Sequence, residues 1–297
     1  MTAHILPLDL RLVRPLLETA LIEDAPTGDL TANLLIPEEA TINAVVNARE
    51  EGVLAGAEVF TEVMHQVDAS IEVHFQLADG QRFAAGDTLA TVVGPARAVL
   101  TAERLGLNLL QRLSAIATTT ADYVRAAGNA RSYRGDTVRI ADTRKTTPGL
   151  RLLERYAVRC GGGFNHRNDL SAAVMAKDNH LSLLGSGEEL TRRLRQAKAK
   201  LGHTVHFEVE IDSLDQLDAV LAAGVDTIML DNFSLTDLRA GVEAIAGAAY
   251  VEASGGITLD RIAEVAATGV DVISSGALTH SVRALDLGLD IDIRAQA

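Results

Sequence analysis

The chain of 297 residues has no tryptophan, one cysteine and only 3% aromatic residues. A single cysteine excludes an internal disulfide and fits a reducing cytoplasm. No apolar run approaches the roughly 18 residues that a membrane-spanning helix needs. The first residues also lack a basic stretch followed by an apolar one, so we expect neither a membrane span nor a secretory signal.

Basic residues are scarce as well, because 27 Lys and Arg stand against 40 Asp and Glu, which gives a net charge of −13. The long-range field of such a chain repels polyanions, which argues against nucleic acid as a partner. Positive charge is concentrated in residues 142–180, where seven basic residues stand against four acids. A local cluster of this kind can bind a small, highly charged anion in a cleft.

Arg144 and Lys145 begin the basic cluster, after a strand-like apolar run and before a Thr-Thr-Pro-Gly turn. Charges at the end of a buried strand usually serve a ligand. In contrast, the spacing of Arg155 and Arg159 predicts a solvated stripe on a helix. Cys160 precedes a run of three glycines, and we interpret it as a packing residue rather than a nucleophile.

The second half of the chain repeats a strand and a helix. Apolar runs end at Glu210, Asp231, Ser254 and Ser275, in steps of 21, 23 and 21 residues. Patterns with three- and four-residue spacing lie between them and predict amphipathic helices. At about 22 residues per repeat the region holds roughly 6.5 repeats, short of the eight in a complete barrel. We therefore predict an α/β fold with an incomplete, TIM-like barrel over residues 116–283.

Short strand-like segments precede the predicted barrel. Residues 41–49, 70–77 and 88–93 are separated by Asp-Gly and Gly-Asp turns, a pattern typical of an antiparallel sheet. Helical patterns flank these segments at residues 10–22, 55–67 and 96–127. The sequence therefore predicts a separate N-terminal α+β domain over residues 1–115.

In a barrel, the residues that end the strands converge on one mouth. Here they are all polar or glycine: Arg144, Lys145, Lys177, Glu210, Asp231, Ser254, Ser275 and Gly276. Some of them allow other interpretations. Lys177 taken alone could form a Schiff base, as in a barrel aldolase. Asn179 and His180 could simply cap the following segment, and paired glycines form a turn as often as a phosphate site.

Six motifs, in order, resemble the quinolinate phosphoribosyltransferases, the decarboxylating nicotinate-nucleotide pyrophosphorylases. They are DTRKTTPGLR, GGGFNHR, KDNH, EVE with LDNF 21 residues on, ASGG and GALTHS. The resemblance covers essentially the whole chain. It departs at Phe164, where a smaller residue is common, and at Ser275, where valine is common. Phe164 puts the shape of the dicarboxylate pocket in doubt.

The resemblance implies a fold and an assembly. The N-terminal domain would be an open sandwich joined by the C-terminal segment 284–297. The protein would be a homodimer, or a higher oligomer built from it, with active sites at the interface. The reaction would convert quinolinate and phosphoribosyl pyrophosphate to nicotinate mononucleotide, pyrophosphate and carbon dioxide, with Mg²⁺, in the synthesis of NAD.

The resemblance also implies the site residues. Quinolinate would bind Thr143, Arg144, His166, Arg167, Lys177 and Arg104 of the neighbouring subunit, since arginine pairs a carboxylate bidentately. Phosphoribosyl pyrophosphate would bind Lys145, Ser254, Gly255, Gly256, Ser275, Gly276 and His280. Glu210 and Asp231 would hold Mg²⁺ and, with Lys145, carry the catalysis. Taken without the family, Arg104 beside Glu103 is an exposed charge on a helix.

Two alternatives compete with this assignment. A transferase that uses nicotinate would need fewer basic side chains around its substrate, whereas four or more favour a dicarboxylate. A non-catalytic paralogue that binds oxyanions for uptake would have no use for two carboxylates at the barrel mouth.

Overall fold

The computed structural model describes residues 5–291. Contacts divide the chain into two compact units: the first holds Met1–Ala121, Thr146–Gly162 and Thr279–Ala297, and the second Asp122–Lys145 and Gly163–Leu278. The predicted barrel domain included residues 146–162, whereas contacts group these residues with the first unit. The predicted boundary between residues 115 and 116 lies inside the continuous helix α4, Ala96–Ala127.

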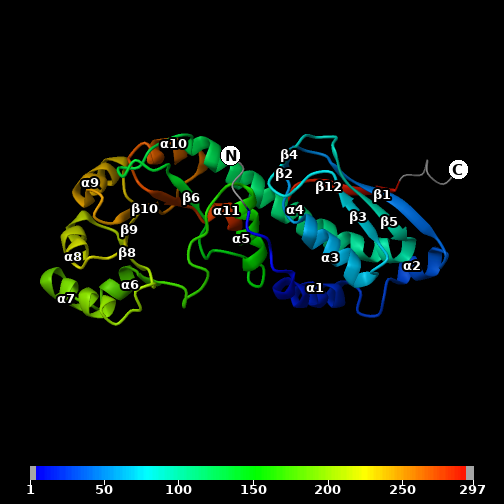
Figure 1. The fold of residues 1–297 in the computed structure, drawn as a ribbon, viewed down its shortest axis with the longest axis horizontal. Coiled ribbons are helices and arrows are strands. Elements are labelled where there is room, and N and C mark those ends of the chain that lie inside the picture. The colour runs from blue at the N-terminus through cyan, green and yellow to red at the C-terminus, as the bar shows by residue number, and fades with distance from the viewer. Residues whose placement is uncertain (1–4, 292–297) are drawn as a thin grey trace. The chain divides into compact units, whose positions relative to one another are not determined.

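An antiparallel sheet forms the centre of the first unit (Figure 1). Its strands, in spatial order, are β12 (Leu287–Ile291), β1 (Thr41–Ala48), β5 (Thr88–Pro95) and β3 (Glu72–Phe75). The three predicted strand segments therefore pair as expected. β12 brings the end of the chain back beside β1, while residues 292–297 of the predicted C-terminal segment lie outside the described residues. A small pair, β2 (Gly52–Val53) and β4 (Arg82–Phe83), completes this part.

The helices of the first unit begin at recognisable signals. They are α1 (Leu10–Asp24), α2 (Leu30–Leu35), α3 (Ala57–Val67), α5 (Arg151–Cys160) and most of α4. Asp9 caps α1 by accepting the backbone N–H of Arg11. Asp79 accepts the first N–H groups of α3, from Gly56 and Ala57.

Six parallel strands form the sheet of the second unit. They are β6 (Arg139–Ala141), β7 (Val174–Ala176), β8 (Phe207–Ile211), β9 (Thr227–Asp231), β10 (Tyr250–Ser254) and β11 (Val272–Ser274), in the order β6-β11-β10-β9-β8-β7. Within the described residues, β6 and β7 are the two edges and do not pair with each other. An open parallel sheet of fewer than eight strands confirms the predicted α/β fold class with an incomplete barrel.

Helices follow these strands, and most of them lie on the outer side of the sheet (Figure 1). They are α6 (Asp178–Leu181), α7 (Gly187–Lys198), α8 (Leu217–Ala222), α9 (Leu235–Ile245), α10 (Ile262–Ala266) and α11 (Ala277–His280), with short 3₁₀ turns at Leu214–Gln216 and Leu259–Arg261. Ile228, Leu230 and Ile273 are completely buried between strands and helices. Among the described residues, no helix combines the length and the apolar character needed to cross a membrane.

Candidate active site

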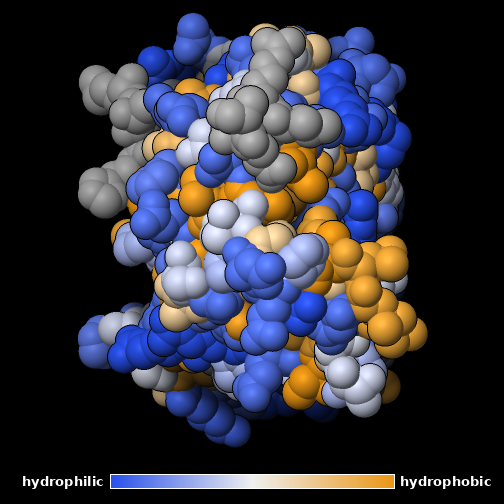
Figure 2. Space-filling view, turned by 90° about the vertical axis from the view of Figure 1, so that its right-hand side faces the viewer, coloured by the Kyte–Doolittle hydropathy of each residue, from blue (hydrophilic) through white to orange (hydrophobic). Residues whose placement is uncertain are grey.

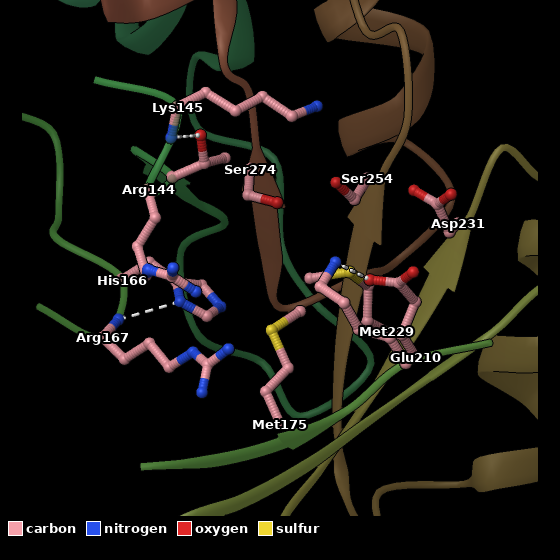
Figure 3. Close-up of a pocket in the computed structure, with 12 residues that line it drawn as sticks. Arg144, Lys145, His166, Arg167, Met175, Glu210, Met229, Asp231, Ser254 and Ser274 are labelled. Atoms are coloured by element: carbon pink, nitrogen blue, oxygen red, sulfur yellow. Dashed lines mark hydrogen bonds and ion pairs between the residues drawn. The ribbon is translucent and has the colours of Figure 1, made fainter. Parts of the chain in front are cut away.

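A cavity of about 350 Å³ opens at the carboxyl ends of the barrel strands (Figure 3). It is lined by Thr143, Arg144, Lys145, His166, Arg167, Met175, Lys177, Glu210, Met229, Asp231, Ser254 and Ser274. All of these residues belong to the second compact unit. Most of the residues that the motifs singled out for quinolinate, and both acids predicted to hold Mg²⁺, therefore meet in one place.

The register of the sheet explains why three of these side chains lie together. Glu210, Asp231 and Ser254 stand at or next to the ends of β8, β9 and β10, and Asp231 is the register partner of Ser254. Because side chains alternate along a strand, a residue that ends one strand and a residue that ends the next can face the same mouth. This local geometry places two carboxylates and a hydroxyl on one wall of the cavity.

The opposite wall is basic, and Figure 3 shows Arg144, Lys145 and Arg167 on that side. Burial, and next the positive charge of Arg144, lower the pKa of Arg167. The Nε of Arg144 is buried and has no hydrogen-bond partner among the described residues. Two neighbouring cations, one with an unused buried donor, favour a ligand that carries more than one negative charge.

Lys177 joins the two walls, since its Nζ lies 2.7 Å from Oε2 of Glu210. Schiff-base chemistry needs an amine that is free to attack a carbonyl, whereas the Nζ of Lys177 is engaged by Glu210. The contact therefore argues against the aldolase interpretation of Lys177. It also means that an incoming anion competes with Glu210 for this lysine.

A turn after α5 places His166 and Arg167 at the cavity, and backbone hydrogen bonds to β6 hold this turn in place. The backbone N–H of Phe164 donates to the carbonyl of Ile140, at 2.8 Å. The buried carboxylate of Asp142 accepts the side-chain amide of Asn165 and the backbone N–H of His166, each at 2.7 Å. The turn is thus held by hydrogen bonds before any ligand binds.

Four residues predicted to contact a phosphate do not line the cavity, and two of them, Ser275 and Gly255, have a structural reason for their identity. Ser275 is buried and its hydroxyl donates to the carbonyl of Ile257, while the preceding Ser274 lines the cavity. Gly255 has φ of +92°, and a Cβ there would stand 2.3 Å from the side-chain oxygen of Asn232. This close approach requires glycine whether or not a phosphate binds. Gly256 and Gly276 do not line the cavity either, so the phosphate roles of these residues remain predictions.

Arg104 and His280 belong to the first compact unit, and their place relative to the cavity stays a prediction. Arg104 has 60% of its side chain exposed and lies 3.8 Å from Glu103. This agrees with the interpretation as an exposed charge on a helix. His280 shares a hydrogen bond of 2.6 Å with the hydroxyl of Ser281.

Other sequence-based interpretations have clear outcomes. Phe164 is 48% exposed and does not line the cavity, and the guanidinium of Arg139 lies 4.9 Å from its ring centroid; the effect of Phe164 on the shape of the pocket stays a prediction. His180 accepts the backbone N–H of Lys177 and caps α6, which favours its structural interpretation.

Two predictions about α5 also have an outcome. Burial, and then the charge of Asp79, raise the pKa of Cys160 to about 12, which agrees with packing rather than nucleophilic catalysis. The predicted solvated stripe was wrong, because Arg155 and Arg159 are half-buried.

Sequence reasoning missed the residues one layer deeper. Met175, Met229 and Ser274 line the cavity, and the buried acids Glu208 and Glu252 lie beneath it. The signal was present in the sequence, because a residue two positions before a strand end points to the same side as that end. Glu208 precedes Glu210, and Glu252 precedes Ser254, by this interval.

Comparisons with known proteins agree with this geometry. Family models described as quinolinate phosphoribosyl transferase match residues 29–114 as the N-terminal domain and residues 116–290 as the C-terminal domain. A probable nicotinate-nucleotide pyrophosphorylase (carboxylating) of Bacillus subtilis is 42% identical over 281 residues, covering 95% of this chain and 94% of that protein. The nicotinate-nucleotide pyrophosphorylase (carboxylating) of Mycobacterium leprae is 42% identical over 284 residues, covering 94% and 96%.

Solved structures give the same result. NadC from Streptococcus pyogenes superposes with a TM-score of 0.89 at 40% identity, covering 97% of this chain and 99% of that one. The nicotinate-nucleotide pyrophosphorylase from Francisella tularensis superposes with a TM-score of 0.88 at 38% identity, covering 98% and 100%. The six motifs, both domain matches and these structures agree, and the chain belongs to the quinolinate phosphoribosyltransferase family.

Proposed function

We propose that this chain transfers a phosphoribosyl group from phosphoribosyl pyrophosphate to quinolinate, with loss of carbon dioxide. The observation that carries the proposal is the cavity in which Arg144, Arg167 and Lys177 face the acids Glu210 and Asp231. Quinolinate carries two carboxylates, which suit several neighbouring cations. The names of the relatives describe the same reaction.

The basic wall binds and orients the pyridine acid in this proposal. Arg144 and Arg167 pair with carboxylate oxygens through their planar guanidinium groups, and Lys177 leaves Glu210 to join them. The ring nitrogen then attacks the anomeric carbon as pyrophosphate departs. The carboxylates of Glu210 and Asp231 face this carbon as it becomes positive and stabilise it.

Magnesium fits the residues at the barrel mouth. Mg²⁺ prefers oxygen ligands and is commonly bound by one or two carboxylates together with substrate phosphates. Glu210 and Asp231 would hold it, directly or through water. When bound, the ion would offset the charge of the leaving pyrophosphate.

Decarboxylation follows the transfer in this scheme. The new N-glycosidic bond makes the ring a pyridinium, whose positive nitrogen stabilises the electron pair left on the adjacent carbon when carbon dioxide departs. That carbon then takes up a proton. No separate decarboxylation cofactor is required, because the substrate itself becomes the electron sink.

The alternatives fit the cavity less well. Four basic side chains, Arg144, Lys145, Arg167 and Lys177, line it, which favours a dicarboxylate over nicotinate. A protein that only bound oxyanions would have no use for Glu210 in the same cavity.

A homodimer with shared sites is also part of the proposal. The exposed position of Arg104 leaves it available to a partner's pocket. In addition, α2 exposes Leu30, Leu34 and Leu35, each at 73%, and Figure 2 shows apolar surface on this face of the first unit. Exposed apolar patches commonly mark protein interfaces. The cytoplasmic location expected from the single cysteine stays a prediction.

The direct test is incubation of the purified protein with quinolinate, phosphoribosyl pyrophosphate and Mg²⁺. We expect nicotinate mononucleotide and carbon dioxide in equal amounts, and no product when nicotinate replaces quinolinate. Turnover of nicotinate with similar kcat/KM would favour the nicotinate transferase. Tight quinolinate binding without any product would favour the non-catalytic protein.

A further inference from the structure

Three titratable side chains meet inside the barrel, one layer below the cavity. Glu208 on β8 and Glu252 on β10 have side chains only 6% and 5% exposed. His166 reaches them from its turn, with Nε2 at 3.0 Å from Oε2 of Glu208 and 3.7 Å from Oε1 of Glu252. The proposed reaction gives these two acids no role.

The second ring nitrogen of His166 fixes its tautomer. Nδ1 accepts the backbone N–H of Arg167 at 2.8 Å, so this nitrogen carries no proton and the ring proton lies on Nε2, facing Glu208. Burial opposes a charged ring, but the hydrogen bond to Glu208 and the charges of Glu252, Glu208 and Asp142 raise the pKa of His166. The raised pKa favours a charged ring, whereas an Nδ1 that accepts a hydrogen bond belongs to a neutral ring. The hydrogen bond decides for the neutral ring, because a proton on Nδ1 would face the N–H of Arg167.

The same tautomer argues against a metal ion at this cluster. One ligating atom of each side chain lies within 4.8 Å of the others, a spacing that an ion could bridge. However, coordination by Nε2 needs its lone pair and therefore a proton on Nδ1. The N–H of Arg167 occupies Nδ1, so Nε2 keeps its proton and faces Glu208 instead.

The two acids cannot both be charged at low cost in this position. Burial, and next the charge of Glu208, raise the pKa of Glu252 to about 8. Besides Glu208, the groups that face Glu252 are His166 and the hydroxyl of Ser274. Oε1 of Glu208 and Oε1 of Glu252 have no hydrogen-bond partner among the described residues.

We propose that Glu208 and Glu252 are positioning residues that hold the Nε2 of His166 as a hydrogen-bond donor, so that its Nδ1 fixes the backbone of Arg167. The Arg167 guanidinium, anchored by a 3.0 Å bond from Nη1 to the carbonyl of Ala173, then faces the ligand carboxylate. Neither ring nitrogen is left for the ligand. His166 therefore acts through Arg167 and not by bonding a carboxylate itself. The inference rests on the proposed function, because its purpose is to place Arg167 for quinolinate.

The first test reads the tautomer directly and needs no turnover. Long-range ¹H–¹⁵N spectra of the full-length protein should show one neutral histidine protonated at Nε2 that disappears in a His166→Gln variant. A His166 ring that is cationic, or protonated only at Nδ1, would overturn the proposal even if the enzyme converts quinolinate. Conversely, the expected tautomer in a protein without turnover would leave the positioning chain intact and refute only the proposed reaction.

The second test separates positioning from folding. Glu208→Gln keeps an oxygen that can accept the His166 N–H, so the KM for quinolinate should stay within about threefold of the parent value. Glu208→Leu removes the acceptor and should raise that KM by about tenfold or more, with the KM for phosphoribosyl pyrophosphate changed less than about threefold.

Glu62→Leu is the matched control, because Glu62 is a largely buried acid paired with Arg14 in the first unit. It should lower the thermal unfolding midpoint without changing either KM. The positioning role is wrong if Glu208→Gln damages quinolinate binding as much as Glu208→Leu, or if Glu208→Leu raises both KM values equally. If Glu208→Leu does not fold, the tautomer of His166 in the parent and the KM of Glu208→Gln for quinolinate still test the positioning role.

Discussion

Arg144 offers the sharpest test of the basic wall. Its side chain is half-buried, its Nε has no hydrogen-bond partner among the described residues, and its positive charge repels that of Arg167. Replacing Arg144 with Ala should therefore weaken quinolinate binding while the free protein keeps its stability. Most single changes that remove a paired buried group lower stability, so this combination is specific to an unpaired cation that awaits a ligand.

The size of the effect follows from the burial of the pair. Truncating one partner of a buried, hydrogen-bonded charge pair costs about 2–5 kcal/mol. The cavity is open to solvent, and screening favours the lower part of that range, about 2–3 kcal/mol, which corresponds to roughly a 30- to 150-fold increase in Kd. Titration calorimetry with quinolinate alone measures this quantity, and thermal unfolding measures stability.

Arg139→Ala provides the control, because Arg139 is an exposed cation at the start of β6, the strand that precedes Arg144; it stacks on Phe164 and does not line the cavity. Its Kd for quinolinate should stay within about twofold of the parent, since exposed charges at a distance are largely screened. An Arg144→Ala protein that binds quinolinate within twofold of the parent would refute the assignment of the basic wall. A large loss of stability would show instead that Arg144 is structural.

Three further predictions test the acids and the shared site. Mixing an Arg104→Ala chain with a Lys177→Ala chain should restore activity, because one pocket of each heterodimer contains neither change; no recovery after confirmed subunit exchange would place Arg104 outside the partner's pocket. Replacing Glu210 or Asp231 with Ala should depress the release of pyrophosphate and of labelled carbon dioxide equally, whereas carbon dioxide released without the sugar donor would contradict the proposed order. The pKa of Glu252, raised from 4.5 to about 8, means that the folded state binds an extra proton between these values, so its stability falls as the pH rises through that window. The thermal midpoint of Glu252→Gln should therefore rise relative to that of the parent as the pH increases from about 5 to 8, and the difference should stay level above pH 8. A difference that does not change with pH would show that this acid does not titrate as inferred.

The sequence predicted the features that depend on local pattern. The long helix α4 has the predicted limits, 96–127, because its apolar spacing continues without a break. Strand ends at Glu210, Asp231 and Ser254 could be located because each apolar run stops at a polar residue, and parallel strands bring such ends together.

Features that depend on contacts between distant segments could not be predicted. The pairing of Lys177 with Glu210 joins residues 33 positions apart and depends on where β7 meets β8. The grouping of residues 146–162 with the first unit follows from packing, since Glu154 on α5 bonds Arg112 on α4 at 2.7 Å. Neither contact leaves a periodic signal in the sequence.

The arrangement of acids explains how an acidic protein keeps a basic cavity. Asp142 uses both carboxylate oxygens on the turn that carries His166, and Glu208 accepts the ring proton of the same residue. Because these carboxylates are engaged in holding the turn, the Nε of Arg144 remains without a hydrogen-bond partner among the described residues. A ligand with two carboxylates can then supply the acceptors that the basic side chains lack. The binding energy comes from pairing these carboxylates with cations that folding has already placed in the cavity.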